Sequence, residues 1–320
     1  MRPILEKKVI ESSKCTACGG CSAICPVHAI PMTSESAFVR EFCIECGFCD
    51  MVCPVLQGYP TGVGYFKLSN SAKSKFKGQD GGITQAILSR LFEEKDIDCV
   101  IGVSKNREWK PQPLIISRRE DLEKIALSKY TYTPLLETLE KAIEQDFGKI
   151  ALTGVGCQIH SASLFREKFS EFGNRIALLL GLFCMETFRH DSLFEYLSEK
   201  NVKAKEIEKF DITKGKFMVK TKQGEFSEKV SKLNYIVREG CKSCEDFPSY
   251  FADISVGSVG SREGWNAVIV RSYDGSRFWE KVKSSLELEE CNVREIKRLT
   301  KYKKRMVREH EAKPYKTLHR

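Results

Sequence analysis

The feature that most constrains this chain is a pair of cysteine runs with the same spacing. The first run is Cys15-x2-Cys18-x2-Cys21-x3-Cys25-Pro26, and the second is Cys43-x2-Cys46-x2-Cys49-x3-Cys53-Pro54. This spacing is typical of ferredoxin domains that hold two 4Fe–4S clusters, in which the fourth cysteine of each run ligates the other cluster. The pattern therefore predicts one cluster on Cys15, Cys18, Cys21 and Cys53, and a second on Cys43, Cys46, Cys49 and Cys25.

Zinc sites and disulfides are the alternatives for so many cysteines. A zinc site usually pairs two C-x2-C units rather than two runs of four. Disulfides need an oxidising compartment, and the first residues, Met-Arg-Pro-Ile-Leu-Glu-Lys-Lys, lack the apolar segment of a secretory signal. We therefore expect a reducing, oxygen-poor cytoplasm, with any membrane association made peripherally through a partner complex.

Length, hydropathy and net charge limit the domain number and the kinds of partner to expect. A chain of 320 residues is long enough for about two domains. The longest uncharged apolar stretch, 176–185, is about half the length that spans a bilayer. The net charge of +9 suits an acidic ligand or an acidic partner subunit. Nucleic acid is not expected, because no recognisable binding motif is present and the charge is spread along the chain.

The pattern of apolar residues predicts two domains of different kinds. Residues 1–57 are expected to form a ferredoxin-like α+β domain, and the Gly- and Pro-rich residues 58–66 a linker. Residues 67–290 alternate apolar strands with helices, which favours an α/β domain with a parallel or mixed sheet. Residues 291–320 are expected to form a basic C-terminal helix and tail. Predicted helices cover 83–94, 120–126, 134–147 and 157–169, predicted strands cover 98–103, 113–117, 149–153, 175–184, 252–256 and 267–271, and a hairpin turns at Gln223-Gly224.

Four cysteines of the second part stand at positions where ligands gather in α/β sheets. Cys157 and Cys184 each follow a predicted buried strand, and Cys241 and Cys244 form a C-x2-C pair. Ligand sites in open α/β sheets lie at the carboxyl ends of strands, so these four thiols could hold a third 4Fe–4S cluster. The alternatives are that Cys157 and Cys184 are small buried core residues, and that the C-x2-C pair binds zinc or forms a redox disulfide. Cys99 and Cys291 are expected to be structural.

Glycine-rich turns offer candidate cradles for an anionic cofactor. Gly78-Gln-Asp-Gly81-Gly82 precedes the helix predicted at 83–94, where main-chain amides can face a diphosphate such as that of a flavin nucleotide. Gly154-Val-Gly156 and Gly257-Ser-Val-Gly260 follow strands in the same way. None of these turns has the G-x-G-x-x-G spacing of a dinucleotide-binding Rossmann fold.

Taken together, these motifs resemble those of a known family. They are Gly78-Gln-Asp-Gly-Gly82, Ser128-Lys-Tyr130, Thr153-Gly-Val-Gly-Cys157-Gln, Gly181-Leu-Phe-Cys184, Gly240-Cys241-x2-Cys244, and 252–260 followed by Gly264-Trp265. The chain resembles the family of beta subunits of coenzyme F420 hydrogenases and dehydrogenases, most strongly the members that admit electrons from reduced coenzyme F420 into a membrane-bound respiratory complex in archaea. One departure is Gly156, where members of the family often have proline.

The resemblance implies a redox function and its cofactors. It implies FAD in the α/β domain, a 4Fe–4S cluster beside it on Cys157, Cys184, Cys241 and Cys244, and two further clusters in the ferredoxin-like domain. Reduced coenzyme F420 would give a hydride to FAD, and single electrons would pass to other subunits of a complex, with no catalytic acid or base. The residues expected at FAD are Gly78, Gln79, Asp80, Gly81, Gly82, Thr84, Ser128, Lys129, Tyr130, Thr153, Gly154, Gly156, Gly257, Ser258, Val259 and Gly260.

Several alternatives stay open from the sequence. Lys129 is a candidate for a phosphate or a flavin carbonyl, or else a surface lysine in a salt bridge. Tyr130 and Trp265 could flank a ring system or belong to the core. The chain could serve a hydrogenase, a formate dehydrogenase or a soluble reductase instead. Alternatives of other kinds are a flavin-free electron carrier of the ferredoxin type and a nicotinamide-using reductase.

Overall fold

The computed structural model describes residues 3–311, and its N-terminal part builds the same loop twice around the two cysteine runs. Ala17 and Glu45 occupy the same place in each run, and both have a positive φ, of 58° for Glu45 and 55° for Ala17. Gly19 and Gly47 follow, with φ of 91° and 78°, and each begins a one-turn helix. Because residues with a Cβ rarely adopt positive φ, its recurrence shows that both runs form the same tight loop. The elements here are the π-helical turn η1 (Glu6–Ile10), α1 (Gly20–Ala23), α2 (Phe48–Met51) and α3 (Pro54–Gln57).

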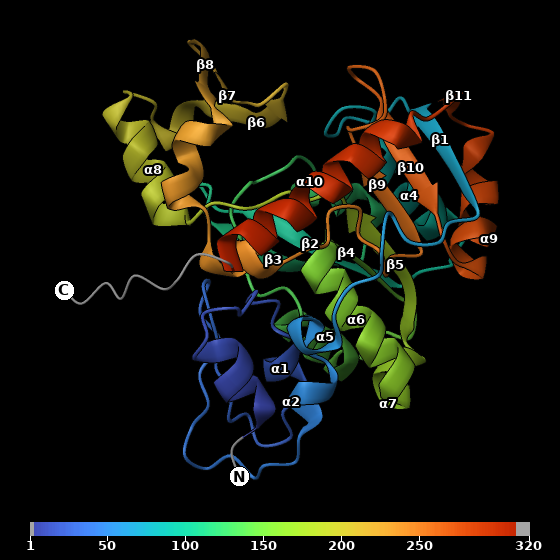
Figure 1. The fold of residues 1–320 in the computed structure, drawn as a ribbon. Coiled ribbons are helices and arrows are strands. Elements are labelled where there is room, and N and C mark those ends of the chain that lie inside the picture. Colours follow the sequence, from blue (N-terminus) through green and yellow to red (C-terminus); the bar gives the residue numbers. More distant parts are fainter. Residues whose placement is uncertain (1–2, 312–320) are drawn as a thin grey trace.

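A mixed eight-stranded sheet forms the centre of the molecule (Figure 1). Its strand order is β11-β1-β10-β9-β5-β4-β2-β3, and the central neighbours β2, β4, β5 and β9 run parallel. The outer pairs are antiparallel, which confirms the predicted mixed sheet. The strands are β1 (Leu68–Lys73), β2 (Cys99–Lys105), β3 (Pro111–Ile116), β4 (Ile150–Val155), β5 (Ile176–Leu182), β9 (Ile254–Gly257), β10 (Asn266–Val270) and β11 (Glu287–Glu289).

Helices cover both faces of this sheet, and the ferredoxin-like part packs on one of them. On β4, Ile150 and Leu152 face the core shared with that part, whereas Ala151 faces the opposite core. This alternation is the period of two that places successive strand residues on opposite faces. Helices α5 (Glu137–Glu144), α6 (Gly156–Lys168) and the short α7 (Ser170–Gly173) lie on the ferredoxin side. Helices α4 (Ile83–Glu93) and α9 (Tyr273–Lys283) lie on the other side.

A smaller unit stands beside the central sheet. Its three antiparallel strands are β6 (Ile207–Thr213), β7 (Lys216–Thr221) and β8 (Gly224–Lys229), and the predicted hairpin of β7 and β8 is confirmed. Phe188, Phe210 and Phe217 fill its core together with residues of α8 (His190–Glu199). The connecting 3-10 turns are η3 (Ala204–Glu206), η4 (Val230–Ile236) and η5 (Glu239–Ser243).

Two predicted segments differ from the structure in kind. The helix predicted at 120–126 is a 3-10 helix, η2 (Arg119–Ile125). Residues 58–66, interpreted as a linker, are bound to the α/β domain: Arg271 donates to the carbonyls of Val63 and Tyr65, each at 2.9 Å, and Tyr250 donates to that of Gly62 at 2.8 Å. Their Gly- and Pro-rich composition therefore marks an irregular path rather than a free connection.

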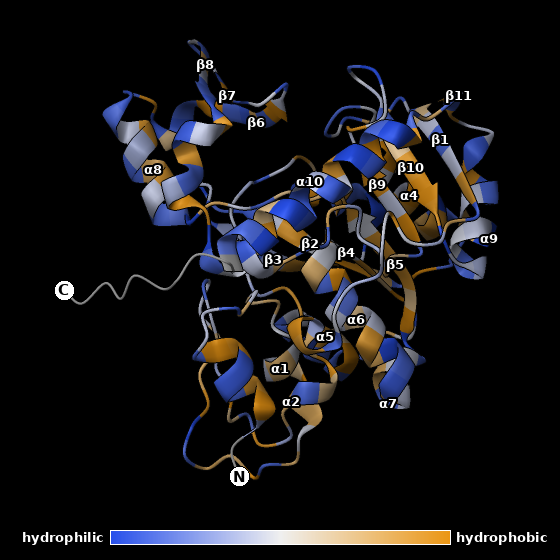
Figure 2. Ribbon diagram, in the orientation of Figure 1, coloured by the Kyte–Doolittle hydropathy of each residue, from blue (hydrophilic) through white to orange (hydrophobic). Residues whose placement is uncertain are grey.

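The basic C-terminal segment forms a long helix, α10 (Val293–Glu311), and residues 312–320 of the predicted tail lie outside the described residues. Figure 2 shows that α10 is largely hydrophilic, whereas β9 and β10 behind it are hydrophobic. Nevertheless Ile296, Thr300, Lys303 and Val307 are buried against the rest of the molecule. The segment is therefore an integral part of the fold. Among the described helices, none combines the length and the apolar character of a bilayer-spanning segment.

Candidate functional site

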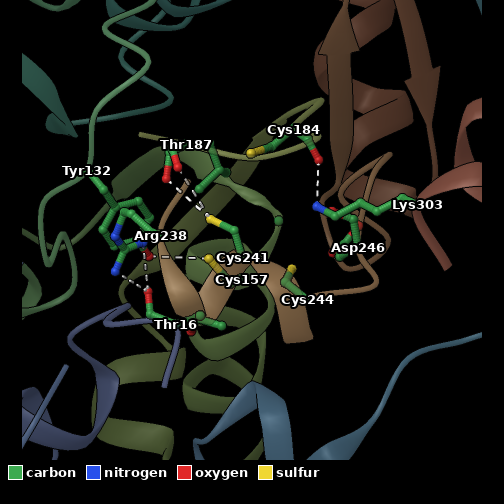
Figure 3. A pocket seen from close by; sticks show the side chains of 13 residues that line it. Thr16, Tyr132, Cys157, Cys184, Thr187, Arg238, Cys241, Cys244, Asp246 and Lys303 are labelled. Atoms are coloured by element: carbon green, nitrogen blue, oxygen red, sulfur yellow. Dashed lines mark hydrogen bonds between the residues drawn. The ribbon is translucent and has the colours of Figure 1, made fainter. Parts of the chain in front are cut away.

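The four cysteines scattered through the second part of the chain come together around one small cavity (Figure 3). Cys157 is the second residue of α6, which begins directly after β4, and Cys184 follows the end of β5. Cys241 and Cys244 come from the turn η5 and the residue after it. The parallel neighbours β4 and β5 bring their carboxyl ends to one edge of the sheet, which explains why residues so far apart in the chain meet there.

The surroundings of these thiols favour their anionic form at some positions and oppose it at others. Burial raises the pKa of Cys184 to about 12. Cys157 and Cys244 are close neighbours, and their interaction lowers the pKa of Cys244 and raises that of Cys157. Tyr132 Oη lies 3.2 Å from the sulfur of Cys157, and Thr187 Oγ1 lies 3.3 Å from that of Cys241. Thiolates are the ligands of iron–sulfur clusters, so the donor set and its polar contacts fit a cluster at this cavity.

Three buried charged side chains border the same cavity. Asp246 is fully buried and its carboxylate accepts from the amide of Tyr250, while burial raises the pKa of Asp246 to about 7. Gly156 packs against Asp246, because a Cβ at position 156 would lie 2.6 Å from the carboxyl carbon of Asp246. This close approach gives a physical reason for glycine at position 156. The cations are Arg238 and, from α10, Lys303.

The cysteines of the two ferredoxin runs are grouped in the crossed arrangement that their spacing predicts. Cys25 of the first run lines a small cavity together with Cys43, Cys46 and Cys49 of the second. Burial raises the pKa of Cys53 well above its usual range, and the neighbouring Cys18 and Cys15 raise it further. Cys53 therefore lies with the first run. Amides also donate to two of the sulfurs, from Ala17 to Cys15 at 3.4 Å and from Ala29 to Cys25 at 3.2 Å.

Among residues 3–311, no three His, Cys, Asp or Glu side chains are grouped as the ligands of one metal ion would be. A cubane cluster is bound through four thiolates that each reach a different iron. The small cavity is lined by four cysteines, which is the number of ligands that such a cluster requires.

The third thiol group is in direct contact with the first ferredoxin loop. Arg238 is 1% exposed, lies 3.9 Å from the ring centre of Tyr132, and donates to the carbonyl of Thr16 at 3.3 Å. Cys15 and Cys18 flank that threonine in their loop. In the second ferredoxin group, Cys46 is exposed to solvent. The third thiol group therefore adjoins the first ferredoxin group, and the second ferredoxin group has a ligand at the surface.

A cavity of about 750 Å³ lies beside the third thiol group, at the carboxyl ends of β4, β5 and β9. Most residues predicted to contact FAD line it: Gly78, Gln79, Asp80, Gly82, Thr84, Ser128, Lys129, Tyr130, Thr153, Gly154, Gly257, Ser258 and Val259. Gly81 and Gly260 face other parts of the protein, Gly156 lines the small cavity, and Trp265 packs under Arg262. The carboxyl edge of the sheet thus collects these motifs, as its topology requires.

Two buried hydroxyls on the wall of this cavity fit a polar cofactor. Thr131 Oγ1 and Thr153 Oγ1 are shielded from solvent and have no hydrogen-bond partner among the described residues. A buried polar group without a partner is unfavourable by about 1–3 kcal/mol. Both side chains line the cavity, so a hydroxyl that rotates toward it would gain a partner from a ligand rich in oxygen and nitrogen, such as a flavin nucleotide.

Lys129 lines the cavity but is held by the protein itself. Its ammonium donates to the main-chain carbonyls of Ile125, Ala126 and Leu127, at 3.2, 2.7 and 2.9 Å. Lys129 is 8% exposed, so it is not the surface lysine that was the alternative. Burial lowers its pKa to about 7. Lys129 therefore shapes the loop 125–127, and contact with a phosphate would require it to release one of these carbonyls.

Sequence reasoning missed the contribution of α10. Leu299, Tyr302 and Met306 of this helix line the large cavity, and Lys303 lines the small one. Their spacing is that of one helix face, which was a usable signal. The lysines 214, 216 and 229 of the small sheet also border the large cavity and were not singled out.

A 4Fe–4S binding domain, a mixed α/β sheet and a cofactor-sized cavity beside buried thiols define a redox protein of the iron–sulfur class. The 4Fe–4S binding domain model matches residues 8–30. The models of the N-terminal and the C-terminal parts of the "Coenzyme F420 hydrogenase/dehydrogenase, beta subunit" match residues 68–140 and 147–296, respectively. The chain belongs to this family of coenzyme F420 hydrogenase/dehydrogenase beta subunits.

Individual relatives agree with this membership. The chain is 35% identical to the F subunit of the F(420)H(2) dehydrogenase of Methanosarcina mazei, over 88% of this chain and 86% of that one. It is 34% identical to the coenzyme F420-dependent sulfite reductase of Methanocaldococcus jannaschii, over 96% of this chain and 52% of that longer protein. It is similar in structure to a chain of the F420-reducing [NiFe] hydrogenase complex from Methanosarcina barkeri, with a TM-score of 0.74 and 30% identity, covering 77% of this chain and 91% of that chain.

Proposed function

We propose that this protein oxidises reduced coenzyme F420 by hydride transfer to FAD and passes single electrons through three 4Fe–4S clusters to a partner complex. The observation that carries the proposal is the shared wall between its two cavities. Cys184, Tyr132, Val155 and Thr187 border both the small thiol-lined cavity and the large one. A cofactor in the large cavity would therefore be a direct neighbour of a cluster in the small one.

FAD would supply the conversion of a two-electron hydride into two single electrons, and the protein's residues would bind and orient it. The amino end of α4 faces the large cavity through Gly82 and Thr84, where main-chain amides favour a diphosphate. Thr131 and Thr153 offer hydroxyls to the same ligand. Tyr130 and Phe183 line the wall and supply apolar surface for a ring system.

The contacts and the exposure of the thiol groups support an order for the electrons. The third group contacts the loop of Cys15 and Cys18 through Arg238 and Gly240. The group of Cys25, Cys43, Cys46 and Cys49 opens to solvent at Cys46. We infer that electrons pass from the third cluster to the cluster of the first run and leave at the cluster with the exposed ligand.

The rim of the large cavity suits an acidic coenzyme. Lys214, Lys216 and Lys229 border it, and the chain carries a net charge of +9. Coenzyme F420 has a phosphate and a polyglutamate tail, which these lysines would attract. The KM for reduced coenzyme F420 should therefore rise with ionic strength. A KM that does not change with salt would argue against capture of the coenzyme by basic residues.

Partner subunits are proposed on the basis of the relatives. The M. mazei relative is named as one subunit of a dehydrogenase, and the M. barkeri structure is that of a hydrogenase complex. We propose that this chain works in the cytoplasm as the electron-input subunit of such a complex, which could be held at the membrane by other subunits. A hydrogenase, a formate dehydrogenase or a soluble reductase is the alternative destination of the electrons.

The test is anaerobic purification with iron, sulfide and flavin quantified, followed by titration with reduced coenzyme F420. About twelve iron and one FAD, with flavin and cluster absorbance bleached by the coenzyme, would support the proposal. About eight iron without flavin would leave a ferredoxin-type carrier. A complete cofactor set that only NADH or NADPH reduces would overturn the substrate.

A further inference from the structure

Helix α10 places one face against both cavities. Leu299, Tyr302 and Met306 reach the large cavity, and Lys303 reaches the small cavity lined by Cys157, Cys184, Cys241 and Cys244. The family model for the C-terminal part ends at residue 296, before these four positions. The roles of these four residues are therefore inferred from the structure and not from the family match.

Lys303 is a buried cation whose direct partners are uncharged. It is 3% exposed, and its ammonium donates to the carbonyl of Cys184 at 2.7 Å and to that of Asp246 at 2.9 Å (Figure 3). Lys303 lines the small cavity together with Cys157, Cys184, Cys241 and Cys244. Its positive charge is therefore held at the thiol group by two main-chain carbonyls.

A fixed charge at this place has a definite electrostatic effect on a cluster. Reduction adds one electron and no proton, so the cluster becomes more negative by one charge. A cation held close by, in a site shielded from water, favours the reduced state and raises the reduction potential. Arg238 lines the same cavity, but its guanidinium is already engaged: it stacks on Tyr132, donates to the carbonyl of Thr16 and pairs with Glu35.

We propose that Lys303 is the counter-charge of the third cluster, and that it raises the reduction potential of this cluster so that it accepts electrons from the cofactor in the large cavity. Lys303 is a positioning residue rather than a ligand: it joins the backbone at Cys184 to that at Asp246 and holds its charge beside the cluster. The proposal rests on the proposed function, because it assumes a cluster on these four thiols.

The experiment is a redox titration of the intact protein, purified anaerobically with its cofactors and followed by EPR for each cluster and by absorbance for the flavin. The variants are Lys303→Met and Lys303→Gln, which remove the charge, and Lys303→Arg, which keeps it. The matched control is Lys304→Met, because Lys304 is the next residue on α10 but bonds to the Pro60 carbonyl and faces Glu245.

We expect the midpoint of the third cluster to fall in the uncharged variants, with the ferredoxin clusters unchanged. The equilibrium constant for one-electron transfer into it should drop roughly tenfold, equivalent to about 59 mV. Lys303→Arg and Lys304→Met should stay close to the natural protein. An uncharged variant that keeps the cluster at an unchanged midpoint would overturn the proposal.

Loss of the cluster is also informative. If both uncharged variants lose it while Lys303→Arg retains it, the cluster requires a positive charge at this position, which supports the role of Lys303 as its counter-charge. If Lys303→Arg loses it as well and Lys304→Met does not, Lys303 acts through its shape and the proposal fails. Measurements on the natural protein distinguish failure of this proposal from failure of the proposed function. If the natural protein shows neither a third cluster signal nor flavin, the proposed function itself fails, before any variant is compared.

Discussion

Gly240 lies directly against the main-chain carbonyl of Cys15. A Cβ at position 240 would be 2.0 Å from that oxygen, far inside the contact distance. The neighbour is backbone of the first ferredoxin loop, so it cannot move aside as a flexible side chain would. This single contact fixes how closely the loop of Cys241 approaches the loop of Cys15 and Cys18.

Substitution of Gly240 by alanine should therefore separate the two loops. We expect a destabilisation of about 1–3 kcal/mol, as for other overpacked sites, together with slower reduction of the ferredoxin clusters by reduced coenzyme F420. Anaerobic denaturation midpoints and rapid-mixing absorbance measure the two effects. Gly148→Ala is the control, because the nearest atom to a Cβ there is 3.6 Å away. Equal behaviour of the two variants would contradict the prediction.

The unpartnered hydroxyl of Thr153 predicts opposite effects on stability and on cofactor binding. Thr153→Val removes a buried hydroxyl that has no partner among the described residues, so the flavin-free protein should be as stable or more stable. The affinity for FAD should fall by about threefold to tenfold, because a hydrogen bond to the cofactor is lost. Calorimetric or fluorescence titration with FAD checks this. Thr138→Val makes the same change at a buried threonine of α5 and should leave the FAD affinity unchanged.

The lowered pKa of Lys129 predicts that the free energy of unfolding depends on pH. Burial lowers its pKa from 10.5 to about 7, so between these values the unfolded chain binds more protons than the native state. The free energy of unfolding should then rise with pH over this window, by up to about 1.4 kcal/mol per pH unit, and this gain disappears as pH falls through 7. Anaerobic denaturation midpoints of the natural protein and Lys129→Met should diverge accordingly. A constant difference from pH 7 to 10 would show that Lys129 keeps its ordinary pKa.

The exposure of Cys46 predicts where electrons leave. Cys46→Ser should remove the outer cluster, lowering iron by about four per chain, while reduction of the flavin by reduced coenzyme F420 persists. Electron transfer to an added two-cluster ferredoxin should fall at least roughly tenfold. Iron analysis, EPR and a coupled assay give the three readouts, with Cys291→Ala as a control outside all thiol groups. Unimpaired transfer to the ferredoxin would place the exit elsewhere.

Much of the α/β domain could be predicted from local pattern. The strands at β2, β4, β5, β9 and β10 and the helices α4 and α6 were predicted within a few residues, because apolar runs bounded by glycine and charged residues carry a strong local signal. The strands of β1, β6 and β11 were not singled out, because short, partly exposed strands lack such runs. The surroundings of a single side chain are harder to predict than a strand or a helix. The aromatic character of Trp265, for example, did not reveal whether it faces a cavity or Arg262.

By itself, the sequence determined the two ferredoxin runs and the turns that line the large cavity, because each of these is a short motif whose spacing constrains its own backbone. Only the tertiary structure decided that Cys157, Cys184, Cys241 and Cys244 share one cavity and that Lys303 joins them. Those residues come from α6, the end of β5, η5 and α10, so their meeting depends on strand order and helix packing. The charge of one lysine among many becomes meaningful only when the fold buries it beside four thiols.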